Sequence, residues 1–130
     1  MDQPLHLEQP LPEPSFFDCH TVQLADGVVL ICVHGEIDDL TAPTLEACLD
    51  QQWSTTPRAG QVEVALIHTT FIGARAITTL LDAAHAADMR TIGFQVTGCS
   101  PHILRVIELV GMREELAASA SPATVPHCRR

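Results

Sequence analysis

The feature that most constrains the fold is a strand-like run that passes directly into a helix-like run at residues 71–77. Phe71 and Ile72 end an apolar segment of β type, and from Ala74 onward apolar residues recur at helical spacing. A turn of this kind leaves free backbone N–H groups in the first turn of the helix, a common place for a phosphate or a nucleophile. Residues 71–77 nevertheless contain no hydroxyl, thiol or carboxylate. We therefore expect this corner to act by shape and contact.

Strand-type and helix-type segments alternate through the rest of the chain. The segments that we expect to be strands are 20–24, 28–34, 61–67 and 91–97. The expected helices run from the capping residue Thr41 to Trp53, over residues 74–87, and from the N-cap Ser100 to the stop at Gly111. Residues 25–27 predict a tight turn, which makes the first two strands an antiparallel hairpin. The order β-β-α-β-α-β-α predicts an α/β fold with a four-stranded mixed sheet.

Helical spacing also predicts which side chains face the core. These are Leu45, Cys48, Leu49 and Trp53 in the first helix, Ile77, Leu80, Leu81, Ala84 and Ala87 in the second, and Ile103, Val106, Ile107 and Val110 in the third.

The 130 residues suit one domain. We expect that domain at residues 18–117, preceded by a flexible, proline-containing leader (1–17) and followed by a disordered tail (118–130) rich in Ala, Ser and Pro.

Charge and hydropathy exclude several classes of function. The formal net charge is −9, and all seven positive residues are arginines, which form no basic run except the terminal pair 129–130. Nucleic-acid binding is therefore not expected. The longest apolar run, 28–33, is too short to span a membrane, and the N-terminus lacks the pattern of a signal peptide. We therefore expect a cytoplasmic protein, in which the five cysteines are reduced. Their odd number and the absence of Cys-x-x-Cys argue against a disulfide scaffold or a zinc knuckle.

No residue pattern indicates an enzyme, a metal site or a cofactor. There is no Gly-x-Ser-x-Gly and no P-loop, and the histidines form no i, i+3 or i, i+4 pair on a predicted helix. Cys99 lies beside the N-cap of the last helix, where a helix dipole lowers thiol pKa values, so it is a candidate redox residue. Glu36, Asp38 and Asp39 follow the second strand and are interpreted as solvated loop acids that can meet a partner.

Four separated motifs resemble the STAS domain family. Residues 34–43 (HGEIDDLTAP) are similar to the family's "GELD" followed by "TAP", and Phe71-Ile72 to the start of its "FIDSSG". Residues 80–84 continue like its second helix, and residues 100–112 are similar to "SP.V.RVLELVGL". The similarity covers about residues 20–116 and implies the STAS architecture of a four-stranded mixed sheet with packed helices.

Stand-alone STAS proteins resemble anti-sigma factor antagonists, which bind an anti-sigma factor, often a serine kinase, and so control sigma-factor-dependent transcription. In that family the kinase phosphorylates a serine of "FIDSSG", and the added charge weakens binding. This chain departs from the motif, because Gly73, Ala74, Arg75 and Ala76 stand where the family has Asp, Ser, Ser and Gly. Ala74 cannot accept phosphate, so the resemblance implies binding without the usual switch.

The expected function is therefore a regulatory module that binds an anti-sigma factor without phosphorylation at position 74. The expected contact residues are Glu36, Asp38, Thr41, Gly73, Ala74, Arg75, Ala76 and Thr78. Two alternatives stay open: a scaffold or self-associating STAS module of a larger signalling assembly, and a small-ligand-binding STAS protein. The sequence leaves the oligomeric state open.

Overall fold

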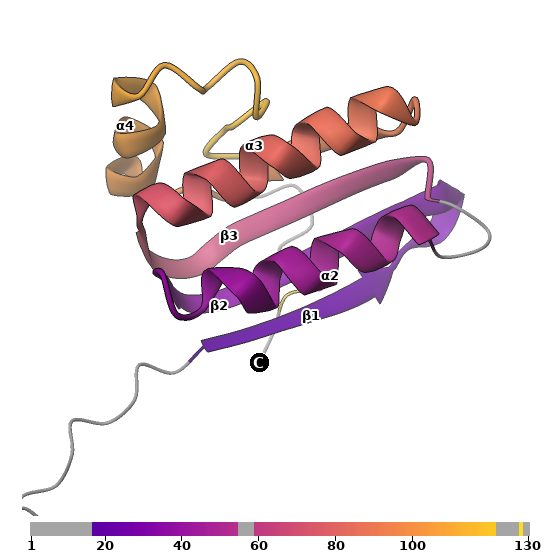
Figure 1. Ribbon diagram of the computed structural model, residues 1–130, viewed down its shortest axis with the longest axis horizontal. Helices are drawn as coiled ribbons and strands as arrows, with labels where there is room; N and C mark the ends of the chain where they lie inside the picture. Colours follow the sequence, from indigo (N-terminus) through magenta and orange to yellow (C-terminus); the bar gives the residue numbers. More distant parts are fainter. Residues whose placement is uncertain (1–16, 55–58, 122–127, 129–130) are drawn as a thin grey trace, which may run out of the picture.

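The computed structural model describes residues 17–54, 59–121 and 128 (Figure 1). Along the chain these residues form β1 (Phe17–Gln23), the short 3-10 helix η1 (Ala25–Gly27), β2 (Val28–Ile37), α2 (Ala42–Ser54), β3 (Gln61–Ile72), α3 (Ala74–Met89), β4 (Gly93–Thr97) and α4 (Pro101–Leu109). The predicted order of strands and helices is confirmed.

The strands form one mixed sheet in the order β1-β2-β3-β4. β1 pairs with β2 in antiparallel fashion, whereas the β2–β3 and β3–β4 pairs are parallel. The predicted hairpin turn is present, with Asp26 and Gly27 both at positive φ (68° and 75°), a conformation that Gly and Asp tolerate. Figure 1 shows α2 and α3 side by side over one face of the sheet, with α4 beyond the start of α3.

The main core lies between the sheet and the helices. Alternate residues of β2 (Val29, Ile31, Val33) and of β3 (Val62, Val64, Leu66) point to this face and are at most 5% exposed. Burial of each such side chain contributes about 1.5–3 kcal/mol before the entropy of ordering the chain is counted. This core fixes the ends of β2 and β3, where the predicted contact residues lie.

Most of the predicted inward positions are buried. Among them are Leu45, Leu49, Ile77, Leu80, Ala87, Ile103 and Ile107. Cys48, Trp53, Leu81, Ala84 and Val106 are only partly buried. The prediction for Val110 was wrong: α4 ends at Leu109, Val110 is its C-cap, and its side chain is 47% exposed. Ser100 caps α4 as predicted, its Oγ accepting the Ile103 N–H at 3.2 Å.

The opposite face of the sheet, called here the second face, carries a smaller apolar cluster of Leu30, Cys32, Ala65 and Cys128. Cys32 and Cys128 are joined by a disulfide across 96 residues of sequence. The prediction that all five cysteines are reduced thiols is therefore wrong for this pair. Neighbouring sequence could not show the pairing, because it depends on residue 128 returning to β2.

The segment after α4 also differs from the prediction. Residues 118–121, expected to be disordered, hydrogen-bond alongside β4: the Ser119 N–H donates to the Val96 carbonyl at 3.0 Å, and the Gly98 N–H donates to the Ser121 carbonyl at 2.8 Å. Backbone pairing needs no side-chain pattern, so an Ala/Ser-rich segment can add to a sheet edge. Residues 1–16, 122–127 and 129–130 of the predicted leader and tail lie outside the described residues.

Candidate functional site

The loop from β2 to α2 is held by the side chain of Thr41. Its hydroxyl donates to the Glu36 carbonyl at 2.7 Å and accepts the Asp38 backbone N–H at 2.9 Å. Thr41 stands at the predicted N-cap position of α2, its carbonyl accepting the Leu45 N–H at 3.3 Å, while its hydroxyl turns back and braces the loop.

Asp38 carries the second set of loop contacts. Its Oδ1 accepts the backbone N–H groups of Leu40 at 2.9 Å and Thr41 at 3.0 Å, as in an Asx turn. These hydrogen bonds stabilise the charged carboxylate and hold the pKa of Asp38 below its ordinary value of 3.8. The bond from the Thr41 N–H has the largest effect. Asp38 is therefore charged at neutral pH and fixed in direction. The interpretation of Asp38 as a solvated loop acid that can meet a partner did not include this structural role.

The strand-to-helix turn after β3 lies against this loop. The Gly73 N–H donates to the Ile37 carbonyl at 2.9 Å, and the β2–β3 register places Glu36 opposite Phe71. Gly73 is the N-cap of α3 and, having no side chain beyond hydrogen, caps no N–H group. This bond brings together two segments more than thirty residues apart in the sequence, both of which carry predicted contact residues.

Most of the predicted contact residues reach the surface. Ala74, Arg75 and Thr78 are exposed, and Glu36, Asp38, Thr41 and Gly73 are half-buried. Thr78 also donates its hydroxyl to the Ala74 carbonyl at 3.3 Å. Ala76 has no exposed surface and packs in the main core, so we leave it out of the contact surface.

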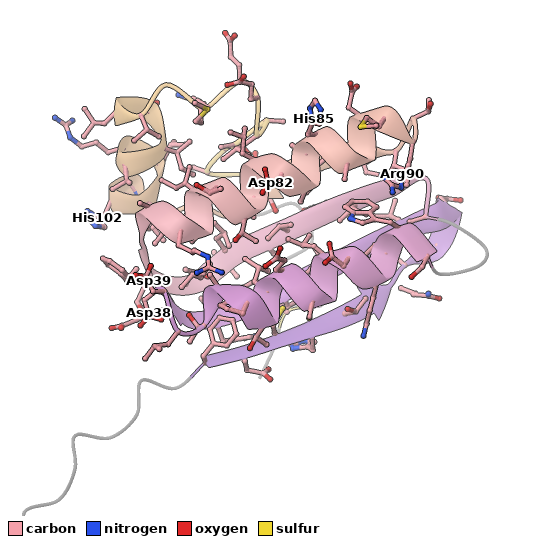
Figure 2. All side chains as sticks on the ribbon, in the orientation of Figure 1. Asp38, Asp39, Asp82, His85, Arg90 and His102 are labelled. Carbon is pink, nitrogen blue, oxygen red and sulfur yellow. A yellow bond between two sulfur atoms is a disulfide. The ribbon has the colours of Figure 1, made fainter. Side chains whose placement is uncertain are left out.

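Two apolar side chains at this surface were missed by the sequence reasoning. Leu40 is 86% exposed and Phe71 is 43% exposed, and a Phe71 ring carbon lies 3.4 Å from where a Cβ on Gly73 would stand. The sequence signals that could have found them were an apolar residue inside a polar loop (Leu40) and an apolar residue near the end of a strand (Phe71). The residues just described, without Ala76, form what we call the loop–turn surface: Glu36, Asp38, Leu40, Thr41, Phe71, Gly73, Ala74, Arg75 and Thr78. Figure 2 shows Asp38 and Asp39 at this end of the molecule, near the start of α3.

Cys99 lacks the properties of a redox residue. Its side chain is 3% exposed, and burial raises the pKa of its thiol to about 11. At neutral pH it is therefore a thiol rather than the reactive thiolate. The suggestion of regulation at Cys99 finds no support in this geometry.

A cavity of about 670 Å³ opens between α3 and β4, away from the loop–turn surface. Asp82, Asp88 and Glu115 contribute carboxylates to its lining, together with His85, and none of the described arginines lines it. Figure 2 shows Asp82 and His85 along α3. Such a lining repels phosphates, which disfavours a nucleotide ligand here.

The structure also brings together Asp18, His20 and His34 on the second face of the sheet. The expectation of no metal site rested on the absence of histidine pairs at helical spacing. The group depends instead on the register of β1 against β2, which no local spacing reveals.

Comparison with known families decides the classification. The sequence matches the STAS domain family over residues 21–125, which is most of the chain. The chain belongs to the STAS domain family. No curated protein sequence matches this STAS chain. Among its described residues, no helix is both long enough and apolar enough to cross a bilayer.

Solved structures with the same fold include two anti-sigma factor antagonists and a transporter-family protein. An anti-sigma factor antagonist from Mycobacterium paratuberculosis has a TM-score of 0.72 and 24% identity, over 92% of this chain and 100% of that one. The anti-sigma factor antagonist SpoIIAA in its unphosphorylated form gives 0.69 and 11%, over 85% and 95%. A sulfate transporter family protein from Wolinella succinogenes gives 0.60 and 16%, over 77% and 82%. At these identities the likeness shows the fold, and the predicted STAS architecture is confirmed.

Proposed function

We propose that this STAS protein is a cytoplasmic anti-sigma factor antagonist that binds its anti-sigma factor without phosphorylation at position 74. The observation that carries the proposal is the Gly73–Ile37 hydrogen bond, which joins the acidic β2–α2 loop to an exposed α3 N-terminus bearing Ala74. The solved antagonists of the same fold support the class of partner.

The loop–turn surface has the composition of a protein-binding site. Leu40 and Phe71 supply exposed apolar area, which is seldom grouped on a monomer surface without a function. Glu36 and Asp38 supply negative charge, and Arg75 supplies a planar donor for a partner carboxylate. We infer that the apolar pair gives most of the affinity and the charges set the orientation.

Position 74 is where phosphate would otherwise be added. Ala74 is the first residue of α3 and is exposed, so a hydroxyl there would be reachable by a kinase. Its methyl group offers no oxygen, and the surface keeps one charge state. Binding in this protein is therefore regulated by the amount of each partner or by a change in the partner.

The test is affinity capture from the native cell, followed by calorimetry with the recombinant partner. We expect wild type to capture an anti-sigma factor, and Ala74→Asp to lower its affinity by at least about tenfold, as one buried like charge does at an interface. The negative charge of an Asp in the first helical turn interacts favourably with the helix dipole, so the variant keeps its fold. Arg75→Ala should also lower the affinity, and Arg105→Ala, at an exposed arginine of α4, is its control.

Two results would contradict the proposal. One is capture of no anti-sigma factor by any form of the chain. The other is equal affinity of wild type, Ala74→Asp and Arg75→Ala for a captured anti-sigma factor. Light scattering on the purified chain distinguishes a partner-binding module from the scaffold alternative, because a self-associating module would already be large in isolation.

A further inference from the structure

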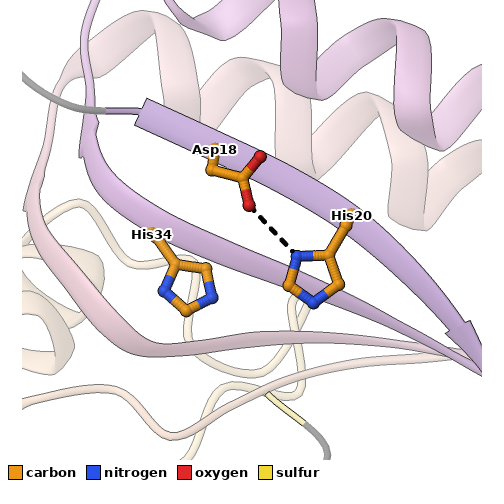
Figure 3. Close-up of side chains that lie close together, drawn as sticks. All are labelled: Asp18, His20 and His34. Carbon is orange, nitrogen blue, oxygen red and sulfur yellow. Dashed lines mark hydrogen bonds and ion pairs between the residues drawn. The ribbon is translucent and has the colours of Figure 1, made fainter. Parts of the chain in front are cut away.

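We propose that Asp18, His20 and His34 bind a divalent transition-metal ion of the zinc class on the second face of the sheet. Figure 3 shows the three side chains turned toward a common space between β1 and β2. One ligand atom from each residue can be chosen so that all three atoms lie within 4.8 Å of one another.

The sheet itself assembles this group. Asp18 and His20 are two residues apart on β1, so their side chains leave the same face of the strand. The antiparallel register puts Asp18 directly opposite His34, and His20 opposite Cys32. His34 therefore faces one ligand across the ladder and the other diagonally. The position of all three residues is set by backbone pairing.

The distances suit a small tetrahedral ion. Asp18 Oδ2 and His20 Nδ1 are 3.2 Å apart. Two ligands of a tetrahedral Zn²⁺ at bond lengths of about 2.0–2.1 Å are separated by about 3.3 Å. The ion can thus take the place of the proton in the Asp18–His20 hydrogen bond. Rotation of the partly exposed Asp18 and His20 side chains then brings their ligand atoms to the same spacing from the fixed His34 ring.

The ligand types select the class of metal. Two imidazoles and one carboxylate are ligands that Zn²⁺ and its neighbours in the first row accept, whereas Ca²⁺ and Mg²⁺ prefer oxygen alone. Three protein ligands leave a fourth position for water or for a donor from another molecule. The net charge of −9 raises the local concentration of any cation.

The surroundings hold one ligand firmly and leave the others accessible. His34 is 2% exposed, and its ring stacks on His20 at 5.5 Å and on His68 of β3 at 4.7 Å between centroids. The side chains of His20 and Asp18 are 36% and 45% exposed. An ion can enter from solvent past His20 and Asp18 and meet a ring already fixed in orientation. His68, opposite His34 in the β2–β3 register, is close enough to support that ring.

An isolated Asp–His pair on a surface stabilises a fold very little. The pair here is not isolated, because a buried imidazole from the next strand faces it. A bound ion would cross-link β1 to β2. The site shares no residue with the loop–turn surface, so its failure and the failure of the proposed function can be told apart.

The experiment uses the full chain without an added histidine tag, stripped by a chelator and titrated with Zn²⁺ alone in a calorimeter. We expect one Zn²⁺ per chain, and a higher melting temperature in its presence. His20→Gln and Asp18→Asn should each weaken binding by more than about tenfold, the loss that even outer partners of metal ligands cause. Both residues are partly exposed, so these variants keep the fold.

The matched control is His102→Gln, at an exposed histidine at the start of α4, on a different element from all three proposed ligands (Figure 2). It should bind like wild type. Titration with Co²⁺ alone should give a d–d spectrum without a thiolate-to-cobalt band, which excludes the free cysteines as ligands. Absence of binding by wild type, undiminished binding by both ligand variants, or a thiolate band would each overturn the proposal.

Discussion

The backbone N–H of Gly73 donates a 2.9 Å hydrogen bond to the carbonyl oxygen of Ile37, the last residue of β2. This one bond ties the entry of α3 to the loop that leads into α2. A change in either segment is therefore transmitted to the other through backbone and not through mobile side chains. A partner that contacts both segments meets a preformed surface, which lowers the entropy cost of binding.

The first prediction concerns the hydroxyl that braces the loop. Thr41→Val removes a donor to the Glu36 carbonyl and an acceptor for the Asp38 N–H. We expect the free energy of unfolding to fall by about 1–2 kcal/mol, because two half-buried backbone groups lose a partner. Urea denaturation measures the change. Thr44→Val, at an exposed position of α2, is the control, and an equal effect of both substitutions would contradict the bracing role.

The second prediction concerns pH. Hydrogen bonds to the carboxylate lower the pKa of Asp38 in the folded protein below 3.8, so the unfolded chain binds this proton more readily. The contribution of Asp38 to stability is therefore complete above pH 3.8 and is lost as the pH falls through the lowered pKa. Asp38→Asn should lack this component of the acid dependence in urea denaturation, whereas Asp39→Asn should retain it. A carboxyl pKa above 3.8 by NMR titration would contradict the assignment.

The third prediction concerns the cross-link between Cys32 and Cys128. It closes a loop of 96 residues between two fully buried side chains. Without reductant, Cys128→Ala should lower the free energy of unfolding by about 2–5 kcal/mol. Adding a reductant should bring wild type to nearly the same value and leave the variant unchanged. Intact mass spectrometry without reductant should find wild type lighter by two hydrogens. A full-mass wild type, unaffected by reductant, would show that the link does not form in solution.

The order of the elements and the fold could be predicted from the sequence because their signals are local. Ser100, Pro101 and Gly111 mark both ends of α4 within a dozen residues, and the structure shows the Ser100 cap. The STAS resemblance also predicted that the β2–α2 loop and the β3–α3 turn contribute to one contact surface. Their contact through Gly73 and Ile37 follows from the parallel pairing of β2 with β3.

The features that could not be predicted from the sequence depend on strand register and on contacts between residues far apart in the chain. Asp18 and His34 are neighbours only because β1 pairs antiparallel to β2 in one particular register. Cys32 and Cys128 meet only after the chain has come back to the second face. Helical spacing made Val110 look buried, but the helix ends one residue before it. Burial of Ala76 is likewise a property of how α3 sits on the sheet.

The central claim is that partner binding does not depend on phosphorylation at the start of α3. It is tested most directly by calorimetry with the captured anti-sigma factor, with and without ATP and the cognate serine kinase. We predict one affinity for wild type under both conditions and no phosphate incorporated at residues 71–79. Ala74→Ser, which restores the hydroxyl at an exposed first-turn position, should take up phosphate and lose affinity by at least about tenfold with ATP. Phosphorylation of wild type in this segment, with release of the partner, would contradict the claim.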